Sequence, residues 1–339
     1  MKRIFALLLS LVLTLGLAAC GNNTQPAGPG GSTSGAPAEN QPATSAESED
    51  ITIGIFVKDN TNPFWRYVVN GAMKAGQDLG IKVVEYTPAE AQNVEQQVSL
   101  VQDAIQAGID GMAVVAIDAD SLLNSCKQAM EAGITVVPFN SRMDSLGCET
   151  FVGIDNYAAM TLIMEEVDKR LNGEGKIVLL EGHLGGYANN IRMEAVNDYL
   201  AAHPGLEVVA DQSGDGQREL SMTVMENILQ SCDEIDAVIC HNDNQAMGAY
   251  QAILAAGRLD EMFITGFDAQ VECLESMVED NPPKINITID QSPFGQGYYS
   301  VEAVYKILKG ESVEKEIPTG GVIVTPDNAQ SILDEFYSE

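Results

Sequence analysis

Basic residues are scarce in this sequence of 339 residues. It contains 18 lysines and arginines against 49 aspartates and glutamates, which gives a formal net charge of −31 at pH 7. Proteins that bind nucleic acids need positively charged surfaces to offset the phosphate charge. The composition therefore argues against a nucleic-acid partner, and an acidic surface of this kind favours solubility.

Patterns typical of metal sites and disulfide frameworks are also missing. The sequence has six cysteines and three histidines. The five cysteines after Cys20 are an odd number, so they cannot all pair within one chain, and no two of them form a C-x-x-C motif. The histidines show no spacing typical of zinc ligands. We expect free thiols and neither a metal nor a cofactor.

The motifs of several enzyme classes are absent as well. The sequence contains no G-x-S-x-G, no Walker A motif and no G-x-G-x-x-G. Residues 182–186 read Gly-His-Leu-Gly-Gly, which is more typical of a flexible loop than of a phosphate cradle. Asp268 has no evident nucleophile or partner acid for general base catalysis. We do not expect an enzyme.

A single long apolar run occurs at the start of the sequence. Residues 4–17 follow Lys2 and Arg3 and have the length of a secretory signal rather than of a transmembrane helix. The next residues, Leu-Ala-Ala-Cys ending at Cys20, resemble a bacterial lipobox, which implies cleavage before Cys20 and lipidation of its thiol. An ordinary signal peptide with an incidental cysteine is the alternative. We predict a signal peptide over 1–19 and an extracytoplasmic lipoprotein anchored to the cell membrane.

The segment after Cys20 differs from the rest in composition. Residues 22–50 consist largely of Gly, Ser, Thr, Pro, Ala, Gln and Asn without periodic apolar positions. Such segments do not bury enough apolar surface to fold, so we predict a lipidated cysteine and disordered linker over 20–50. From residue 51, roughly 290 residues remain, which is enough for two domains with separate cores.

Short apolar runs then alternate with helical patterns to the end of the chain. Residues 51–57 predict a strand, and Asn62-Pro63 predicts the start of a helix that Gly80 ends. The alternation continues with strands predicted at 81–86, 112–117, 134–139, 176–180, 206–210, 237–240, 262–265, 285–289 and 321–325. Alternating strands and helices indicate an α/β fold, here with two parallel sheets covered on both faces.

Polar residues follow many of these predicted strands. In open α/β sheets, ligands bind beyond the carboxyl ends of the strands. Asparagines and aspartates at these ends, with aromatic residues beside them, suit a neutral polyhydroxy ligand, because carboxylates and amides bind hydroxyls and rings stack on the C–H face of a sugar. Each such residue alone is equally typical of a helix N-cap or turn. Their occurrence at so many strand ends predicts a shared cleft.

Five motifs at these ends resemble a known family. They are Asn62-Pro63-Phe64-Trp65, Phe139-Asn140, His241-Asn242-Asp243 with Ala246-Met247-Gly248-Ala249, Gly266-Phe267-Asp268, and Ile289-Asp290-Gln291-Ser292-Pro293. Together they are similar to the ribose- and galactose-binding proteins, which are type I periplasmic binding proteins serving sugar ABC importers. The resemblance runs from about residue 51 to the C-terminus.

The resemblance implies two Rossmann-like lobes with parallel sheets, joined by a three-segment hinge. Lobe one would comprise 51–153 and 292–322, and lobe two 154–291 and 323–339. The ligand would bind between the lobes, which close on it. The residues implied or expected to bind it are Lys58, Asn62, Phe64, Trp65, Asn140, Asn190, Asn242, Phe267, Asp268 and Gln291.

Several positions depart from the ribose receptor. Lys58 stands in place of a serine, Ala116 of an asparagine, Ser141 of an arginine, and Gly216 of a stacking aromatic residue. Asn190 also replaces an arginine, for which Arg192 is either a shifted equivalent or a structural residue. These changes imply a differently shaped pocket, so a hexose, a sugar derivative and a polyol all stay open, and Lys58 or Arg142 could meet an anionic group.

The calcium loop of the galactose receptor is not visible, because residues 168–176 are too few and carry too few carboxylates.

Taken together, the motifs and the strand ends predict a monomeric receptor that captures a small polar ligand, most simply a monosaccharide, and delivers it to an ABC transporter permease. A sensor that presents its ligand to a chemoreceptor or membrane kinase is the alternative. A transcriptional regulator of the lactose-repressor type shares this fold, but a signal peptide replaces its helix-turn-helix.

Overall fold

The computed structural model describes residues 51–338, with side chains to residue 334. The predicted signal peptide, the lipidation site at Cys20 and the linker to residue 50 lie outside the described residues. Within residues 51–338, the structure contains no helix that is both long and apolar enough to span a membrane.

The first half of the described chain builds a parallel sheet. Its strand order is β2-β1-β3-β4, and every pairing is parallel. The elements are β1 (Thr52–Phe56), α1 (Pro63–Leu79), β2 (Lys82–Tyr86), α2 (Val94–Ala107), β3 (Gly111–Val114), α3 (Ala119–Glu131) and β4 (Thr135–Pro138), followed by the 3₁₀ turn Asp144–Leu146. A bridge between Phe139 and Val152 continues the sheet to β5 (Phe151–Gly153), which pairs in parallel with the distant β11 (Glu316–Pro318).

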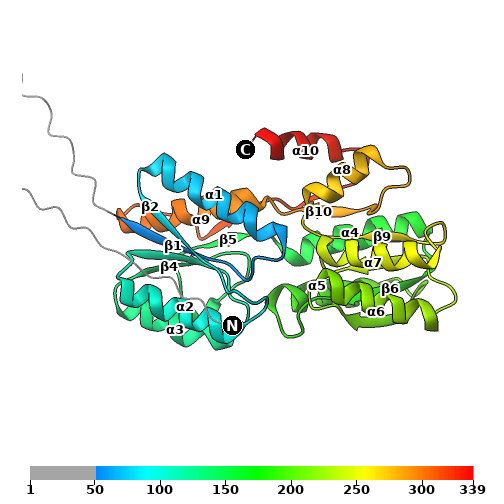
Figure 1. Ribbon diagram of the computed structural model, residues 1–339, viewed down its shortest axis with the longest axis horizontal. Helices are drawn as coiled ribbons and strands as arrows, with labels where there is room; N and C mark the ends of the chain where they lie inside the picture. The colour runs from blue at the N-terminus through cyan, green and yellow to red at the C-terminus, as the bar shows by residue number, and fades with distance from the viewer. Residues whose placement is uncertain (1–50, 339) are drawn as a thin grey trace, which may run out of the picture. The chain divides into compact units, whose positions relative to one another are not determined.

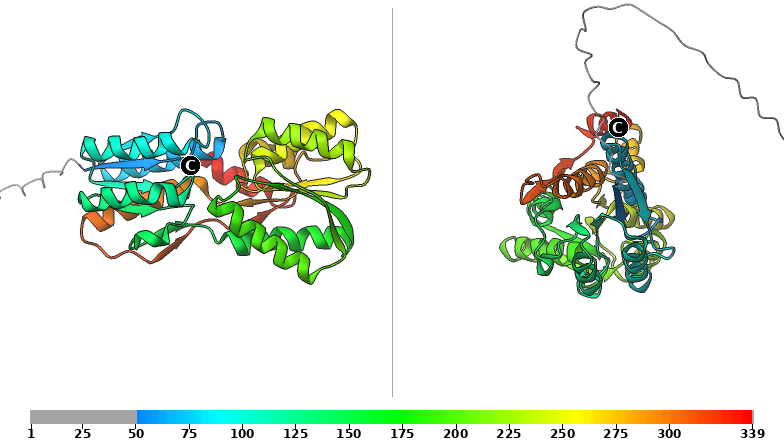
Figure 2. Two further views of the ribbon diagram at one scale, coloured as in Figure 1. Left: turned by 90° about the horizontal axis from the view of Figure 1, so that it is seen from below. Right: turned by 90° about the vertical axis from the view of Figure 1, so that its left-hand side faces the viewer.

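Helices cover both faces of this sheet (Figures 1 and 2). Successive strand residues point to opposite faces, so Ile53 and Ile55 pack under α1 and α9 (Pro293–Leu308), whereas Phe56 packs under α2 and α3. The contact of α9 with α1 is close, because a Cβ on Gly71 would overlap the backbone of Phe294. A late segment of the chain therefore completes the first half of the molecule.

A second parallel sheet has the order β7-β6-β8-β9. Its elements are α4 (Asn156–Leu171), β6 (Gly175–Glu181), α5 (Tyr187–Ala202), β7 (Leu206–Ser213), α6 (Arg218–Ser231), β8 (Ala237–Cys240), α7 (Asp243–Ala256), β9 (Phe263–Thr265) and α8 (Val271–Glu279). Leu180 and Cys240 face α6 and α7, and Leu179 and Ile239 face α4 and α5. This sheet is therefore covered on both faces as well.

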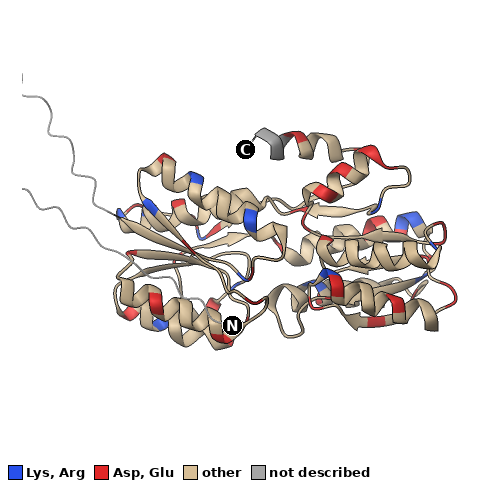
Figure 3. Cartoon of the chain, viewed as in Figure 1, with Lys and Arg blue, Asp and Glu red and all other residues tan. Residues whose placement is uncertain are grey.

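The end of the chain completes this second half. The strand β10 (Thr288–Asp290) pairs antiparallel with β12 (Val322–Val324), and a parallel bridge joins Thr265 to Ile287. The last helix, α10 (Ala329–Ser338), packs against α8. Acidic residues are distributed over the helices of both halves (Figure 3).

We call the two halves lobe one (β1–β5, α1–α3, α9 and β11) and lobe two (α4–α8, β6–β10, β12 and α10). The chain passes between them three times: from β5 to α4, from β10 to α9, and from β11 to β12. That these three crossings act as a hinge remains our prediction.

The predicted α/β fold with two parallel sheets is confirmed, and three details differ from the expectation. The pairing of β5 with β11 and the helix α10 were not predicted, and the segments expected as strands 285–289 and 321–325 form a short antiparallel pair. Strands of three residues show too few alternations for a periodic pattern, so their partners emerge only in three dimensions.

Candidate functional site

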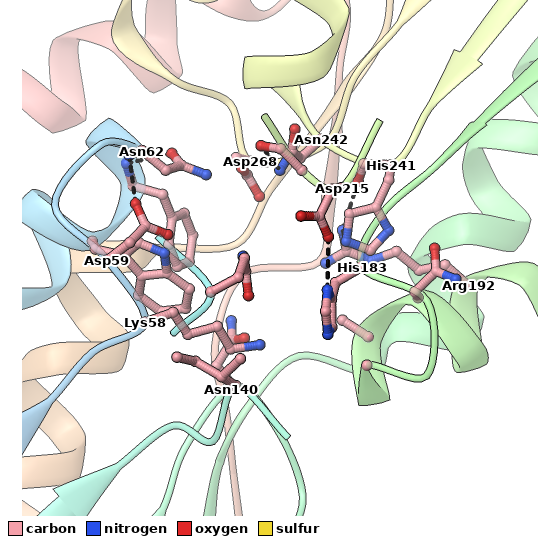
Figure 4. Close-up of a pocket in the computed structure, with 18 of the residues that line it drawn as sticks. Lys58, Asp59, Asn62, Asn140, His183, Arg192, Asp215, His241, Asn242 and Asp268 are labelled. Carbon is pink, nitrogen blue, oxygen red and sulfur yellow. Dashed lines mark hydrogen bonds and ion pairs between the residues drawn. The ribbon is translucent and has the colours of Figure 1, made fainter. Parts of the chain in front are cut away.

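A cavity with an empty volume of about 640 Å³ lies between the two lobes (Figure 4). Its walls come from the loops that follow the carboxyl ends of strands in both sheets, which is where open α/β folds bind ligands. Eight of the ten residues expected from the sequence line it: Lys58, Asn62, Phe64, Trp65, Asn140, Asn242, Asp268 and Gln291.

The loop after β1 forms the wall contributed by lobe one, and its conformation is fixed by local hydrogen bonds. One oxygen of Asp59 accepts bonds from the backbone N–H groups of Thr61 and Asn62 and from the Thr61 hydroxyl, at 2.8–2.9 Å. The Asn62 side chain caps α1 by accepting from the N–H of Phe64 at 3.0 Å. This loop therefore presents its side chains from a rigid turn.

Two aromatic rings cover part of the same wall. Phe64 and Trp65 pack edge to face, with ring centroids 4.8 Å apart. Both line the cavity although little of their surface is exposed, with 7% for Trp65. Rings in this position offer an apolar surface to one side of a ligand.

Lys58 brings a positive charge to the aromatic wall. Its Nζ lies 5.9 Å from the centroid of the Trp65 ring, within the range of a cation–π contact. Burial lowers the pKa of Lys58 to about 8, and the nearby charge of Arg192 acts in the same direction. The ammonium has no hydrogen-bond acceptor among residues 51–338, so it is free to bind an oxygen of a ligand.

Amide side chains connect the two lobes at the base of the cavity. Asn140, at φ +58°, follows β4 and donates to Gln296 Oε1 at 3.0 Å. Gln291 lies at the crossing from β10 to α9 and donates to Asp268 Oδ1 at 2.5 Å. Gln291 also accepts a long bond of 3.5 Å from Asn140. Polar groups from both lobes thus meet below the ligand space.

Asp268 is the carboxylate of lobe two that borders the cavity. It has an unusual φ of +131°, and the loop that carries it is held by the buried Asp243. Asp243 accepts from the N–H of Gln270 at 2.7 Å and from the hydroxyl of Thr288 at 2.7 Å. Burial, followed by repulsion from Asp243, raises the pKa of Asp268 to about 8. A ligand hydroxyl that donates to Asp268 would offset this desolvation.

Arg192 is the cation of lobe two, and it is anchored from three sides. Its Nε donates to Asn156 Oδ1 at 2.9 Å, and Nη1 donates to the carbonyl of His241 at 2.7 Å. The guanidinium lies 3.5 Å above the ring of Phe267. Burial lowers the pKa of Arg192 to about 10, a value at which it keeps its charge at neutral pH. The sequence left open whether Arg192 is a structural residue or a binding residue. In the structure, its contacts stabilise lobe two and it also borders the cavity.

Two of the expected residues lie elsewhere. Phe267 is fully buried behind Arg192 and does not line the cavity. Asn190 also lies off the cavity, and its side chain donates to the carbonyl of Gly185 at 3.3 Å. Its neighbour Asn189 borders the cavity instead and is held by Gly182 N and Glu181. One residue along a helix changes direction by about 100°, which accounts for the difference.

A histidine–aspartate pair in the cavity was not predicted. His183 follows β6, Asp215 follows β7, and their Nδ1 and Oδ1 atoms lie 2.6 Å apart. Both residues line the cavity. Only their position after strands signalled them in the sequence, because the pairing joins two separate loops.

One hydrogen bond joins the lobes directly beside the cavity. Gln270, which precedes α8 in lobe two, donates from Nε2 to Asn62 Oδ1 in lobe one at 2.9 Å. The same nitrogen lies 3.4 Å from Asp268 Oδ2. Gln270 thereby connects the carboxylate of one lobe with the helix cap of the other.

Within the described part of the chain, no group of three or more His, Cys, Asp or Glu residues is placed to hold a metal ion. The five cysteines in this part are free thiols, and three of them are buried in the cores: Cys126, Cys240 and Cys273.

Comparison with known families agrees with this architecture. Residues 53–312 match the periplasmic binding protein domain family. This match spans most of the chain, so the chain belongs to the periplasmic binding protein family. The resemblance found in the sequence motifs is confirmed. This is a family of binding proteins rather than of enzymes.

Individual relatives share most of their length with this chain. The ribose import binding protein of Bacillus subtilis is 32% identical over 278 residues, covering 82% of this chain and 88% of the relative. The xylitol-binding protein of Mycolicibacterium smegmatis is 28% identical over 300 residues, covering 87% and 83%. The crystal structure of an ABC transporter solute binding protein from Bacillus halodurans with bound myo-inositol has a TM-score of 0.78 and 30% identity, covering 86% of this chain and all of the other.

Proposed function

We propose that this protein is an extracytoplasmic receptor that binds a monosaccharide or a closely related polyol between its lobes and delivers it to an ABC importer. The observation that carries this proposal is the cavity itself. It joins aromatic rings, amides, a carboxylate and two cations from both lobes around a space suited to a small polar molecule. Relatives named for ribose, xylitol and myo-inositol binding support a polyhydroxy ligand.

The polar groups suit hydroxyls because they offer both donors and acceptors. Asp268 and the carbonyl oxygen of the Asn140 side chain accept, whereas Lys58 and Arg192 donate. Phe64 and Trp65 offer a surface for C–H groups. We expect these residues, with Asn62, Asn242 and Gln291, to contact the ligand.

Binding and closure are coupled in this proposal. A ligand that contacts both lobes binds the closed arrangement more tightly, so it shifts the population toward that arrangement. The three crossings between the lobes act as the hinge. The closed surface is then recognised by a permease, with a monomeric receptor tethered to the membrane through lipidated Cys20.

Titration of tryptophan fluorescence tests this function. Trp65 is the single tryptophan in the sequence, and it lines the cavity. We expect a saturable change in its emission when full-length protein is titrated with one member of a panel of D-ribose, D-allose, myo-inositol and xylitol. Trp65→Phe serves as the control, with binding followed by calorimetry.

No binding of any panel member by fluorescence, by calorimetry or by thermal shift would contradict the proposal. Thermal shift is sensitive here, because a ligand at 1,000 times its Kd adds about 4 kcal/mol to the stability of the folded state.

A further inference from the structure

The two walls of the cavity differ in the chemistry that they offer to a ligand. Lobe one contributes the rings of Phe64 and Trp65, whereas the cavity-lining residues of lobe two include no phenylalanine, tyrosine or tryptophan. Gly216 lines this wall, and its φ of +71° disfavours a bulky side chain there. The wall opposite the aromatic rings is therefore polar.

His183 and Asp215 occupy this polar wall, and the loops that carry them are joined firmly. The hydroxyl of Ser213 donates to the carbonyl of Gly182 at 2.6 Å, and the N–H of Asp215 donates to Ser213 Oγ at 3.1 Å. The N–H of Gly214 donates to the carbonyl of Glu181 at 2.9 Å. These bonds hold the loops after β6 and β7 together, so the His183 imidazole and the Asp215 carboxylate are fixed relative to each other.

The Asp215 carboxylate sets the hydrogen position on the imidazole. Its Oδ1 lies 2.6 Å from His183 Nδ1, and its Oδ2 accepts from Gln217 Nε2 at 2.9 Å. A carboxylate with both oxygens accepting requires the hydrogen on Nδ1 of the imidazole. In neutral imidazole, Nε2 then carries a lone pair and is an acceptor.

The Nε2 atom of His183 has no hydrogen-bond partner in residues 51–338, although the residue lines the cavity. Figure 4 shows Nδ1 directed at Asp215 and the opposite edge of the ring turned toward the side of the cavity where Lys58 and Asn140 lie. Asp118, which caps α3 in lobe one, also lies close enough to interact with His183 electrostatically.

We infer that His183 determines ligand specificity: its Nε2 accepts a hydrogen bond from a ligand hydroxyl that faces lobe two, and Asp215 and Gln217 hold it in that role. The inference rests on the proposed function and narrows its ligand class. The ligand is a polyol with an apolar side toward Phe64 and Trp65 and a hydroxyl directed at the opposite wall. A ligand that lacks or inverts this hydroxyl loses the contact and leaves Nε2 unpaired.

Nitrogen-15 NMR of the imidazoles tests the hydrogen position, and the chain suits this experiment because it has only three histidines. We expect the imidazole of His183 to carry its hydrogen on Nδ1 and none on Nε2, and its signals are assigned by their loss in His183→Ala. In Asp215→Asn, Gln217 keeps the amide oxygen toward itself, so the amide nitrogen faces Nδ1 and moves the imidazole hydrogen to Nε2. A wild-type imidazolium, or a wild-type hydrogen on Nε2, overturns the inference.

Binding measurements test recognition. For each panel member that binds the full-length wild-type protein, analogues that lack or invert one hydroxyl are titrated as well. We expect His183→Ala to weaken binding of the parent ligand about tenfold, the effect of one lost hydrogen bond. The variant should no longer discriminate at one hydroxyl position, and Asp215→Asn should behave in the same way. His203→Ala is the control, because His203 stacks on Tyr199 at the end of α5 and does not line the cavity.

Three results of these binding measurements would also overturn the inference. Unchanged affinity in His183→Ala shows that the residue does not contact the ligand. Equal weakening of the parent and all analogues shows that it acts on closure, through Asp118, rather than on recognition. Absence of binding by the wild type contradicts the proposed function itself, and is thereby distinguished from the first two results.

Discussion

The two walls of the cavity are built in different ways. In lobe one, all the binding side chains except that of Asn140 come from one short segment, residues 58–65, which is held by its own turn and helix cap. In lobe two, they come from four separate loops and one helix, and bonds over long sequence distances hold them, such as those of Arg192 to Asn156 and His241. A substitution of the unpaired Lys58 in the first wall should therefore affect binding alone, whereas one of Arg192 in the second should affect binding and folding together.

The largest expected effect is that of Asp268→Ala. The substitution removes the buried carboxyl group that hydrogen-bonds with ligand hydroxyls, so we expect binding to weaken by about 3 kcal/mol, or roughly a hundredfold. Calorimetric titration of the ligand found with Trp65 measures this change. Asp260→Ala, on an exposed turn, is the matched control and should leave the affinity unchanged. An Asp268→Ala variant with wild-type affinity would place the ligand elsewhere.

The two cations separate binding from folding most clearly. Lys58→Met should weaken binding about tenfold without lowering the free energy of unfolding, because the ammonium has no hydrogen bond to the rest of residues 51–338 to lose. Arg192→Met should lower the free energy of unfolding by about 2 kcal/mol, because it leaves the buried acceptors of Asn156 and His241 unpaired. Urea unfolding measures the free energy of unfolding of both ligand-free variants. Equal loss of stability in the two variants would refute the distinction between the walls.

The pH dependence of stability tests the burial of Asp268. Its pKa is raised to about 8 in the folded protein, so between its ordinary value near 4 and 8 the folded state binds more protons than the unfolded state. This contribution to the free energy of unfolding is present at low pH and is lost as the pH rises toward 8. We expect the stability of the ligand-free wild type to fall relative to Asp268→Asn over this range. A constant difference between the two unfolding free energies would show that Asp268 is not buried as described.

The smallest effect is expected at the bond between the lobes. Gln270→Ala removes the donor to Asn62, so the closed arrangement loses about 1 kcal/mol, and binding of every ligand should weaken by roughly the same factor of about five. Titration of several panel members tests this uniformity, and Gln330→Ala, at an exposed position of α10, is the control. A loss confined to one ligand would mean that Gln270 contacts the ligand instead.

The same difference between the lobes explains which binding residues could be predicted from the sequence. One strand, β1, is followed directly by Lys58, Asn62, Phe64 and Trp65. Their position after a strand predicted all four, and the family motif also predicted Asn62, Phe64 and Trp65. In lobe two, Asn190 was expected where Asn189 lines the cavity. The helix α5 carries polar residues on several sides, so its sequence does not reveal which side faces the ligand.

Phe267 and His183 show two further limits. An aromatic residue beside a binding aspartate suggests stacking on the ligand, but the φ of +131° at Asp268 turns the loop, and Phe267 packs inward under Arg192 instead. His183 depends on Asp215 and Gln217 in another loop, and this pairing has no local signature in the sequence. Contacts between separate segments arise only from the fold.

A crystal structure of the complex with the panel ligand of lowest Kd tests whether both walls bind one ligand. We expect a single ligand in the cavity, with its apolar side on Trp65, a hydroxyl bonded to Asp268, and polar contacts to Lys58 in lobe one. Contacts from one lobe alone, or a ligand bound outside this cavity, would contradict this expectation.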